Sequence, residues 1–410
     1  MYDWANSVYS LTISTAILPS YFIFATGGKA GRVLGINNES VYAYILSLSF
    51  LIVSCLNPIL SAMADTGGNR KKFMQGFSLL GSISCGLLFF FDQLHVWVGL
   101  VFSITASIGY TGSLVFYNSF LPEIVPEDQI DKVSAKGFSL GYLGSVLLLI
   151  VNLITVEAVF PDNPLGPKLS FLTVGIWWFV FAQYSFASLP KDKRKKTPDN
   201  IIKKSFIRLK VVWRQLKRLP WTRKFLYSFF FYSMGTQTVM YMATIFGEEV
   251  IHMNMTELII LVLILQLVAI AGSYLFAFIS KRKGNVYSIL ITIGIWILIC
   301  LTASVLQEGM KLAFYIVGAF VGLVMGGIQS MSRATFAKLI PVNTNMKTSY
   351  YSFYETLEKF AMASGTFVFG VISQLLGSMN YSAFVLSIFF IIGFLILRQI
   401  PSQKSYSIKV

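Results

Sequence analysis

Three charged residues, Glu355, Glu358 and Lys359, lie inside a long apolar stretch near the C-terminus. Glu355 and Lys359 are four positions apart, so in a helix they share one face and can form an ion pair. A carboxylate in apolar surroundings favours its protonated form, which makes Glu355 or Glu358 a candidate proton carrier. The alternatives are a buried structural ion pair and a pair that extends toward a polar interface, and the pattern does not decide between them.

Uncharged polar residues interrupt other apolar stretches. In hydrocarbon each such group is costly, and it usually faces a cavity or a neighbouring helix. Hydrogen bonding to a solute and hydrogen bonding between helices explain any one of these residues about equally well. The candidates for contact with a small-molecule substrate are Asn6, Asn118, Tyr142, Gln237, Tyr241, Gln266 and Gln329.

Other chemistries lack the residue patterns that they need. The three cysteines all lie in apolar segments and the two histidines lie singly in polar loops, so we expect neither a disulfide framework nor a metal site. The sequence shows no Gly-rich phosphate loop and no cluster of groups suited to a membrane-embedded enzyme. We therefore expect no cofactor and no enzymatic activity.

The elements that position these residues follow from composition. Of 410 residues, 55% are hydrophobic and 12% are charged, about half the charge of an ordinary soluble domain. A chain this apolar needs the bilayer as its solvent. A span needs about 20 apolar residues, and twelve stretches qualify, at 2–26, 41–64, 73–92, 96–120, 134–157, 169–189, 223–247, 256–280, 286–306, 312–336, 349–376 and 380–399. The fold class is an all-α polytopic membrane protein with twelve transmembrane helices.

Basic residues are concentrated in alternate loops. Fourteen Lys and Arg residues lie between Lys191 and Lys224, and further clusters follow the second and eighth spans at 70–72 and 281–283. This sidedness places both termini in the cytoplasm, which requires an even number of spans. The net charge of +15 is therefore a membrane signal, and we expect no nucleic-acid partner.

The longest connection divides the chain into two halves of six spans. We expect an N-terminal bundle at 1–189, a linker at 190–222, a C-terminal bundle at 223–400 and a cytoplasmic tail at 401–410. Within the linker, apolar and basic residues alternate at helical spacing, so a helix there can lie against anionic lipid headgroups along 191–219. The alternative is a linker that only tethers the two halves. We expect a monomer.

The two halves repeat each other. The pair Gly68-Asn69 after the second span returns as Gly284-Asn285 after the eighth, at an offset of 216 residues. Two six-helix bundles in parallel repeat are typical of the major facilitator superfamily fold, in which one half rocks against the other around a midplane site. The loop from Asp65 through Gly68 to Arg70 resembles the signature cytoplasmic loop of that superfamily. Its glycine permits a tight turn, and its charges indicate a conformational latch, in which we include Arg333 at the end of the tenth span.

Four motifs narrow the resemblance. They begin at Tyr2-Asp3-Trp4 in the first span, Ser134 in the fifth, Gly235 in the seventh and Gly326 in the tenth. Together they resemble the vacuolar-effluxer-like branch of the superfamily, whose yeast member exports amino acids from the vacuole. Gln237 and Gln329 lie in these motifs, which favours them as substrate contacts. The chain departs from the family at Ser233 and Met234, where an Asn-Asp pair is usual, so a charge expected there is missing.

The resemblance implies a secondary active transporter that moves a small polar metabolite, with amino acids as the family-level expectation and proton coupling as one option. The membrane is then the bacterial inner membrane, or the vacuolar membrane in a eukaryote. The alternative is a receptor or scaffold that uses the same fold without transport.

Overall fold

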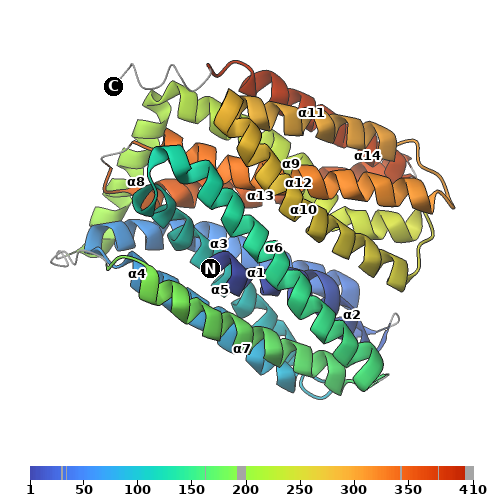
Figure 1. Ribbon diagram of the computed structural model, residues 1–410. Coiled ribbons are helices and arrows are strands. Elements are labelled where there is room, and N and C mark those ends of the chain that lie inside the picture. The colour runs from blue at the N-terminus through green and yellow to red at the C-terminus, as the bar shows by residue number, and fades with distance from the viewer. Residues whose placement is uncertain are drawn as a thin grey trace. The chain divides into compact units, whose positions relative to one another are not determined.

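The computed structural model describes residues 1–28, 31–33, 35–161, 163–191, 200–341, 344–376 and 378–401. Most of the predicted tail therefore lies outside the described residues. The helices of the N-terminal part (Figure 1) are α1 (Tyr2–Val8), η1 (Tyr9–Ile17), α2 (Leu18–Ala25), α3 (Asn38–Gly67), α4 (Arg70–Leu87), η3 (Leu88–Phe90), α5 (Val96–Ile124), η4 (Glu127–Gln129), α6 (Ile130–Ile154), η5 (Thr155–Val159) and α7 (Leu165–Ser188). The rest are α8 (Ile201–Arg218), α9 (Pro220–Glu249), α10 (Met255–Lys283), α11 (Asn285–Ala303), α12 (Lys311–Leu339), α13 (Lys347–Leu376) and α14 (Met379–Leu397), and a short hairpin pairs β1 (Arg32–Val33) with β2 (Ile36–Asn37).

Each of the twelve predicted spans corresponds to helical structure within a few residues of its expected ends. Eleven stretches among the described residues are long and apolar enough to cross a membrane. The twelfth span is α9, which has 30 residues. It is less apolar than the eleven because polar residues recur along it, among them Ser233, Thr236 and Gln237. The twelve-helix prediction is confirmed.

Residues with special backbone geometry end the helices at the turns. Gly68 and Gly284 follow α3 and α10 with φ of 64° and 92°, values that residues with a side chain rarely adopt. At the start of α10, Asn254 and Glu257 form a capping box, in which each side chain accepts the other's backbone N–H. The repeated Gly-Asn turns of the sequence are thus tight turns between successive spans.

The first span departs from a regular α-helix. Its middle section, η1, is a nine-residue π-helix, a rare form that usually occurs as a single turn at functional sites. Pro19 lies in the first turn of α2, a position that tolerates the missing N–H of proline. The sequence predicted the span but not this local widening.

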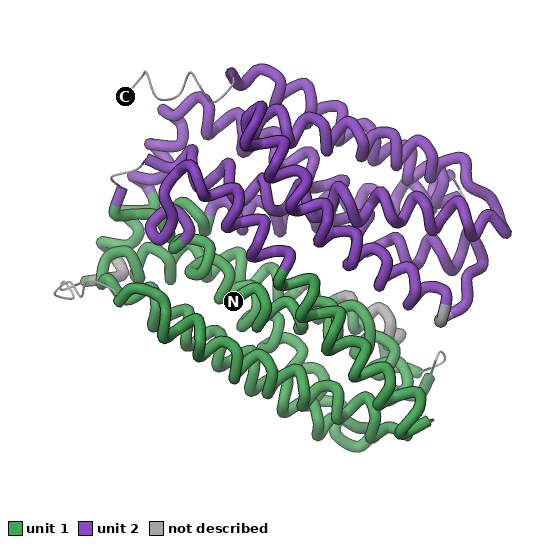
Figure 2. Tube along the Cα trace, in the orientation of Figure 1, with its two compact units in different colours: residues 1–120, 140–209, 345–352 green, residues 121–139, 210–344, 353–410 purple. Residues whose placement is uncertain are grey.

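The described chain forms two compact units (Figure 2). Unit 1 comprises residues 1–120, 140–209 and 345–352, and unit 2 comprises residues 121–139, 210–344 and 353–410. The units therefore follow the two halves of the chain except in short segments, at 121–139 and 345–352. The first of these segments contains the start of α6 and the second contains the start of α13.

Glycines allow close helix packing within each unit. In unit 2 a Cβ at Gly326 of α12 would overlap the carbonyl oxygen of Ala269 on α10. In unit 1 a Cβ at Gly144 of α6 would lie 3.1 Å from the backbone oxygen and the ring of Trp4. Small residues let backbones approach closely, so these glycines act as packing surfaces between helices.

Candidate functional site

A polar cluster lies between α9 and α13 in unit 2. Gln237 on α9 donates a hydrogen bond from Nε2 to Glu358 Oε1 at 2.9 Å. On α13, Lys359 Nζ lies 3.7 Å from Glu358 Oε2, and the two side chains are 14% and 20% exposed. An amide, a carboxylate and an ammonium group thus meet at one place, partly accessible in a bundle of apolar helices.

Other predicted substrate contacts lie in the same unit. Tyr241 follows Gln237 by one helical turn and is partly buried. Gln329 on α12 contacts the Sδ atom of Met240 on α9 at 3.4 Å. Within the described part of the chain, Gln266 Oε1 on α10 is buried and accepts no hydrogen bond, which leaves it available to a donor on a solute.

Glu355 stands one turn before the Glu358–Lys359 pair and is 3% exposed. The sequence predicted that Glu355 would share a helix face with Lys359, and α13 is continuous through both residues. In the structure Lys359 lies within ion-pair distance of Glu358, its neighbour in sequence. The site therefore contains two carboxylates and one cation within a little more than one turn.

The candidates in unit 1 are buried. Asn6, Asn118 and Tyr142 are 1%, 7% and 8% exposed. Asn6 Nδ2 is buried without an acceptor among the described residues, while its Oδ1 lies 3.5 Å from Ser7 Oγ. Nearby in sequence, Asp3 accepts a 2.6 Å hydrogen bond from the hydroxyl of Tyr117 on α5. This bond joins the Tyr2-Asp3-Trp4 motif to α5.

The predicted latch residue Asp65 caps a helix. It accepts hydrogen bonds from the backbone N–H and the hydroxyl of Ser349, at 2.8 and 2.7 Å, and from the N–H of Thr348 at 3.4 Å. These donors lie in the first turn of α13, where N–H groups have no partner inside the helix. The sequence did not predict Thr348 and Ser349 as partners, because they lie more than 280 positions away.

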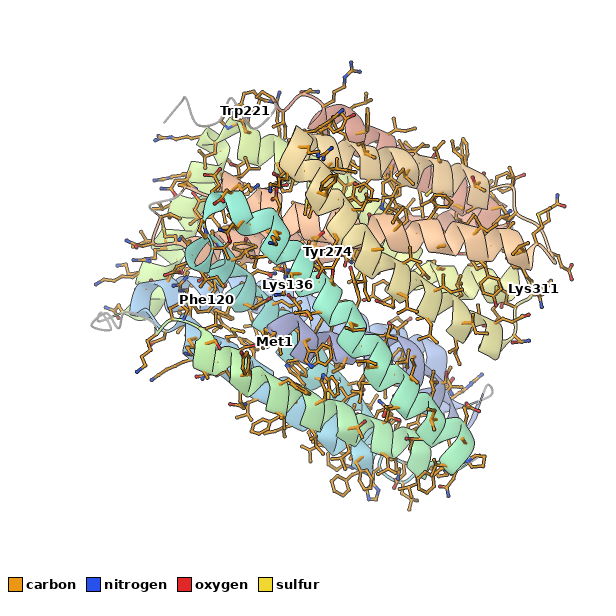
Figure 3. The ribbon with its side chains drawn as sticks, in the orientation of Figure 1. Met1, Phe120, Lys136, Trp221, Tyr274 and Lys311 are labelled. Atoms are coloured by element: carbon orange, nitrogen blue, oxygen red, sulfur yellow. The ribbon has the colours of Figure 1, made fainter. Side chains whose placement is uncertain are left out.

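The other latch candidates lie next to the turn between α3 and α4, or in unit 2. Gly68 supplies the left-handed backbone of that turn. The guanidinium group of Arg70 lies 4.9 Å from the centre of the Phe120 ring, which Figure 3 labels on α5. In unit 2, Arg333 is 5% exposed and donates to Ser134 Oγ and Ser134 O at 3.0 and 2.9 Å. It also stacks on Phe138 at 4.2 Å, so it fastens the first turns of α6.

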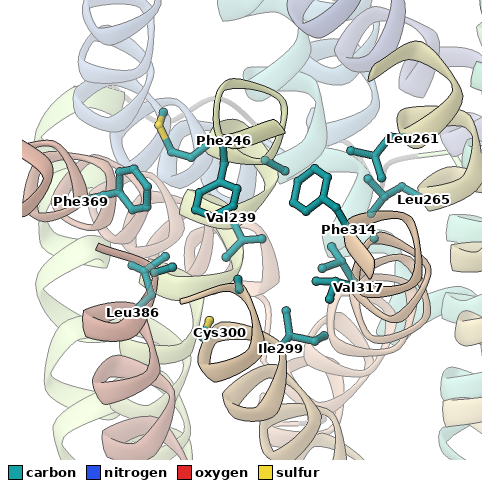
Figure 4. Close-up of a pocket in the computed structure, with 16 residues that line it drawn as sticks. Val239, Phe246, Leu261, Leu265, Ile299, Cys300, Phe314, Val317, Phe369 and Leu386 are labelled. Carbon is teal, nitrogen blue, oxygen red and sulfur yellow. The ribbon is translucent and has the colours of Figure 1, made fainter. Parts of the chain in front are cut away.

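Unit 2 also contains a cavity of about 60 Å³ (Figure 4). Its lining is apolar and comes from all six long helices of the C-terminal half, including Val239, Phe246, Leu261, Cys300, Phe314 and Phe369. A polar solute would find no hydrogen-bond partner there. The polar cluster of Gln237, Glu358 and Lys359 is therefore the better candidate for solute binding. Among the described residues no three His, Cys, Asp or Glu side chains are grouped in a way that could hold a metal ion.

Twelve spans with buried polar residues in both units are typical of the major facilitator superfamily fold. The chain is similar to the fucose transporter FucP in its outward conformation, with a TM-score of 0.73, 14% identity, and coverage of 98% of this chain and 97% of that one. It is also similar to the human organic anion transporter MFSD10, with a TM-score of 0.71, 14% identity, and coverage of 97% and 98%. At these identities the likeness shows the fold alone.

Sequence comparison defines the family. The chain belongs to the vacuole effluxer Atg22-like family, whose model matches residues 1–407. It is 30% identical to the uncharacterized MFS-type transporter YxiO of Bacillus subtilis, over 99% of this chain and 94% of that protein. It is 27% identical to autophagy-related protein 22 of Coccidioides immitis, over 85% of this chain and 70% of that protein. The resemblance drawn from the four motifs is confirmed.

Proposed function

We propose that this protein is a secondary active transporter that moves a small polar metabolite by alternating access, with an amino acid as the favoured substrate class. The observation that carries the proposal is the hydrogen-bonded cluster of Gln237, Glu358 and Lys359. It supports the proposal because polar groups held in an apolar bundle are costly, and those found there commonly mark the path of a solute or an ion.

The chemistry of the cluster favours a zwitterion. An amino acid carries an ammonium group and a carboxylate, which match the carboxylate of Glu358 and the ammonium group of Lys359. Gln237 can accept from one end of such a solute and donate to the other. Asn6, Asn118, Tyr142, Tyr241, Gln266 and Gln329 are proposed as further contacts. The name of the family model, a vacuole effluxer, agrees with export of a solute.

Proton coupling is assigned to Glu355 or Glu358. Either carboxylate can take up a proton when the adjacent cation is engaged by a solute carboxylate, since the charge that stabilises the ionised form is then shared. Asp65, Gly68, Arg70 and Arg333 are proposed to act in the conformational latch and not to touch the solute.

The test is uptake of radiolabelled amino acids into liposomes that contain the purified protein and a pH gradient. Glu358→Gln should reduce uptake by about 100-fold, within the range that loss of one charge-assisted contact produces. Glu308→Gln is the matched control, because its carboxylate is 75% exposed in a loop and should leave uptake unchanged. If Glu355→Gln and Glu358→Gln both leave gradient-driven uptake intact, the assignment of the proton carrier is wrong.

The linker helix α8 is proposed to bind anionic lipid headgroups. Its Val212 and Leu216 are buried, whereas Phe206 and Trp213 are 53% and 50% exposed. The exposed side also carries Lys203, Lys204, Lys210, Arg214, Lys217 and Arg218. Exposed aromatic residues among cations are typical of a helix at a membrane surface. A monomer with both termini in the cytoplasm completes the proposal.

A further inference from the structure

A buried charged network holds the start of α6 within unit 2. Asp131 Oδ1 accepts from Asn285 Nδ2 at 2.7 Å and lies 2.7 Å from Lys338 Nζ. Its other oxygen accepts from Ser280 Oγ at 2.8 Å. Lys338 also donates to Asn285 Oδ1 at 2.9 Å, so the carboxylate, the ammonium group and the carboxamide form a closed ring of contacts.

The network is buried and does not stand alone. The side chains of Asp131 and Lys338 are only 10% and 9% exposed. One turn further along α6, Ser134 donates to the carbonyl oxygen of Ser330 at 2.7 Å and receives both bonds from Arg333. Ser139 then reaches the carbonyl oxygen of Ile270 at 3.4 Å. Figure 3 labels Lys136 on this part of α6 and Tyr274 on α10.

The position of the network in the repeat relates it to the Asp65 contact. The offset of 216 residues that matches Asn69 with Asn285 also matches Asp131, at the start of α6, with Lys347, at the start of α13. The same two regions therefore meet in both places: the end of the second span of a half with the turn that follows it, and the first turn of a fifth span. In the first contact the end of the second span supplies the acid, as Asp65. In the second the helix supplies the acid, as Asp131.

This reversal changes the chemistry. Asp65 accepts hydrogen bonds from backbone N–H groups and one hydroxyl and interacts with the charge of Arg70, whereas Asp131 shares one oxygen between Asn285 and the ammonium group of Lys338. A buried pair that loses one partner leaves the other charge uncompensated, which is strongly destabilising for that contact. Opening the second contact therefore requires Asp131 and Lys338 to be hydrated together.

We infer that Asp131 is the central residue of a second conformational latch, an ion-paired counterpart of the Asp65 contact. Asp131 is a positioning residue that acts through Lys338, Asn285 and Ser280. The latch fastens residues 121–139 to the C-terminal helices, while the remainder of α6, from residue 140, belongs to unit 1. Release of this segment is then a step of alternating access, so the inference rests on the proposed function.

The test measures thiol labelling in nanodiscs, in a background in which Cys55, Cys85 and Cys300 are replaced by Ala. One reporter is Ala135→Cys, because Ala135 is fully buried on the latched segment. The second is Gln266→Cys, in the half of α10 predicted to be non-cytoplasmic. Asp131→Asn should raise the labelling rate at position 135 and lower it at position 266, each by about tenfold, within the usual range of coupling between sites.

Controls separate a latch from a loosened fold. Asp128→Asn removes an exposed acid three residues earlier and should change neither rate, and Asp131→Glu should restore most of the labelling pattern of the native chain. Lys338→Gln should reproduce the effect of Asp131→Asn, and the double variant should add little to either. Equal acceleration at both reporters would show a merely structural role, and no change at either would overturn the inference. Because labelling needs no solute, an error in the proposed substrate or coupling ion leaves these outcomes readable.

Discussion

The contact between α10 and α12 allows a quantitative prediction for Gly326→Ala. The new Cβ would overlap the carbonyl oxygen of Ala269 and lie 2.9 Å from its carbonyl carbon. Backbone atoms cannot rotate away as a side chain can, so the two helices must separate by about 1 Å to restore a normal contact with that oxygen. The displacement also stretches the 3.2 Å hydrogen bond from Ser273 Oγ to Gly326 O.

The magnitude follows from three terms. Overpacking against backbone costs about 3 kcal/mol, at the upper end of its usual range. Loss of the interhelical hydrogen bond costs about 1 kcal/mol, and replacing glycine by alanine in a helix returns about 1 kcal/mol. We expect a net loss of about 3 kcal/mol, which corresponds to a fall of roughly 5 °C or more in Tm. The matched control is Gly294→Ala on α11, where a Cβ would meet nothing within 4 Å, so that variant should be as stable as the native chain or more so.

The assay follows reaction of a fluorogenic thiol dye with Cys300 during heating. Cys300 is 2% exposed and lies in unit 2, and replacing Cys55 and Cys85 by Ala makes it the single reporter. A Tm for Gly326→Ala equal to or above that of the Gly294→Ala control would refute the close approach of α10 and α12.

Two further predictions concern the loops and the linker. Asp92 accepts from the backbone N–H of His95 at 2.9 Å and lies 2.8 Å from its ring Nδ1, and the side-chain bond lowers the pKa of Asp92. A lowered pKa contributes stability that is present above the unfolded value and lost as pH falls through the folded one. The difference in Tm between the native chain and Asp92→Asn should therefore be constant above about pH 5 and should shrink as the pH falls below about 4. For α8, replacing four exposed cations by Gln should abolish the gain in Tm that anionic lipid gives over zwitterionic lipid in nanodiscs, while Lys281→Gln with Lys283→Gln should keep it. The four positions are Lys203, Lys210, Arg214 and Lys217.

The fold could be predicted because the length and spacing of apolar runs determine how many helices can cross a bilayer. Even α9 was read as a span from its own residues at 223–247, and the even number of spans that the basic loops require supported it independently. The π-helix of η1 escaped prediction, since it is a local change of hydrogen bonding with no distinct composition. The helix ends at Gly68 and Gly284 were readable from the glycines alone.

The contacts of the site were less predictable than its members. Gln237 and Glu358 were each singled out as polar residues in apolar spans, but their mutual hydrogen bond joins positions 121 apart. Asp131 drew no attention, because an acid at the start of a helix is ordinary and only the folded chain brings Lys338 to it. Pairings over such separations depend on helix packing, which one sequence does not specify.

The apolar cavity beside Cys300 bears on how this protein is handled once it leaves its membrane. Because its walls offer no hydrogen bond, only hydrocarbon gains free energy by entering, at about 25 cal/mol for each Å² removed from water. During extraction the most abundant hydrocarbon is the tail of the surfactant itself. Melting temperatures of the C-terminal bundle should accordingly depend on alkyl chain length and branching, so variants are comparable only in one surfactant.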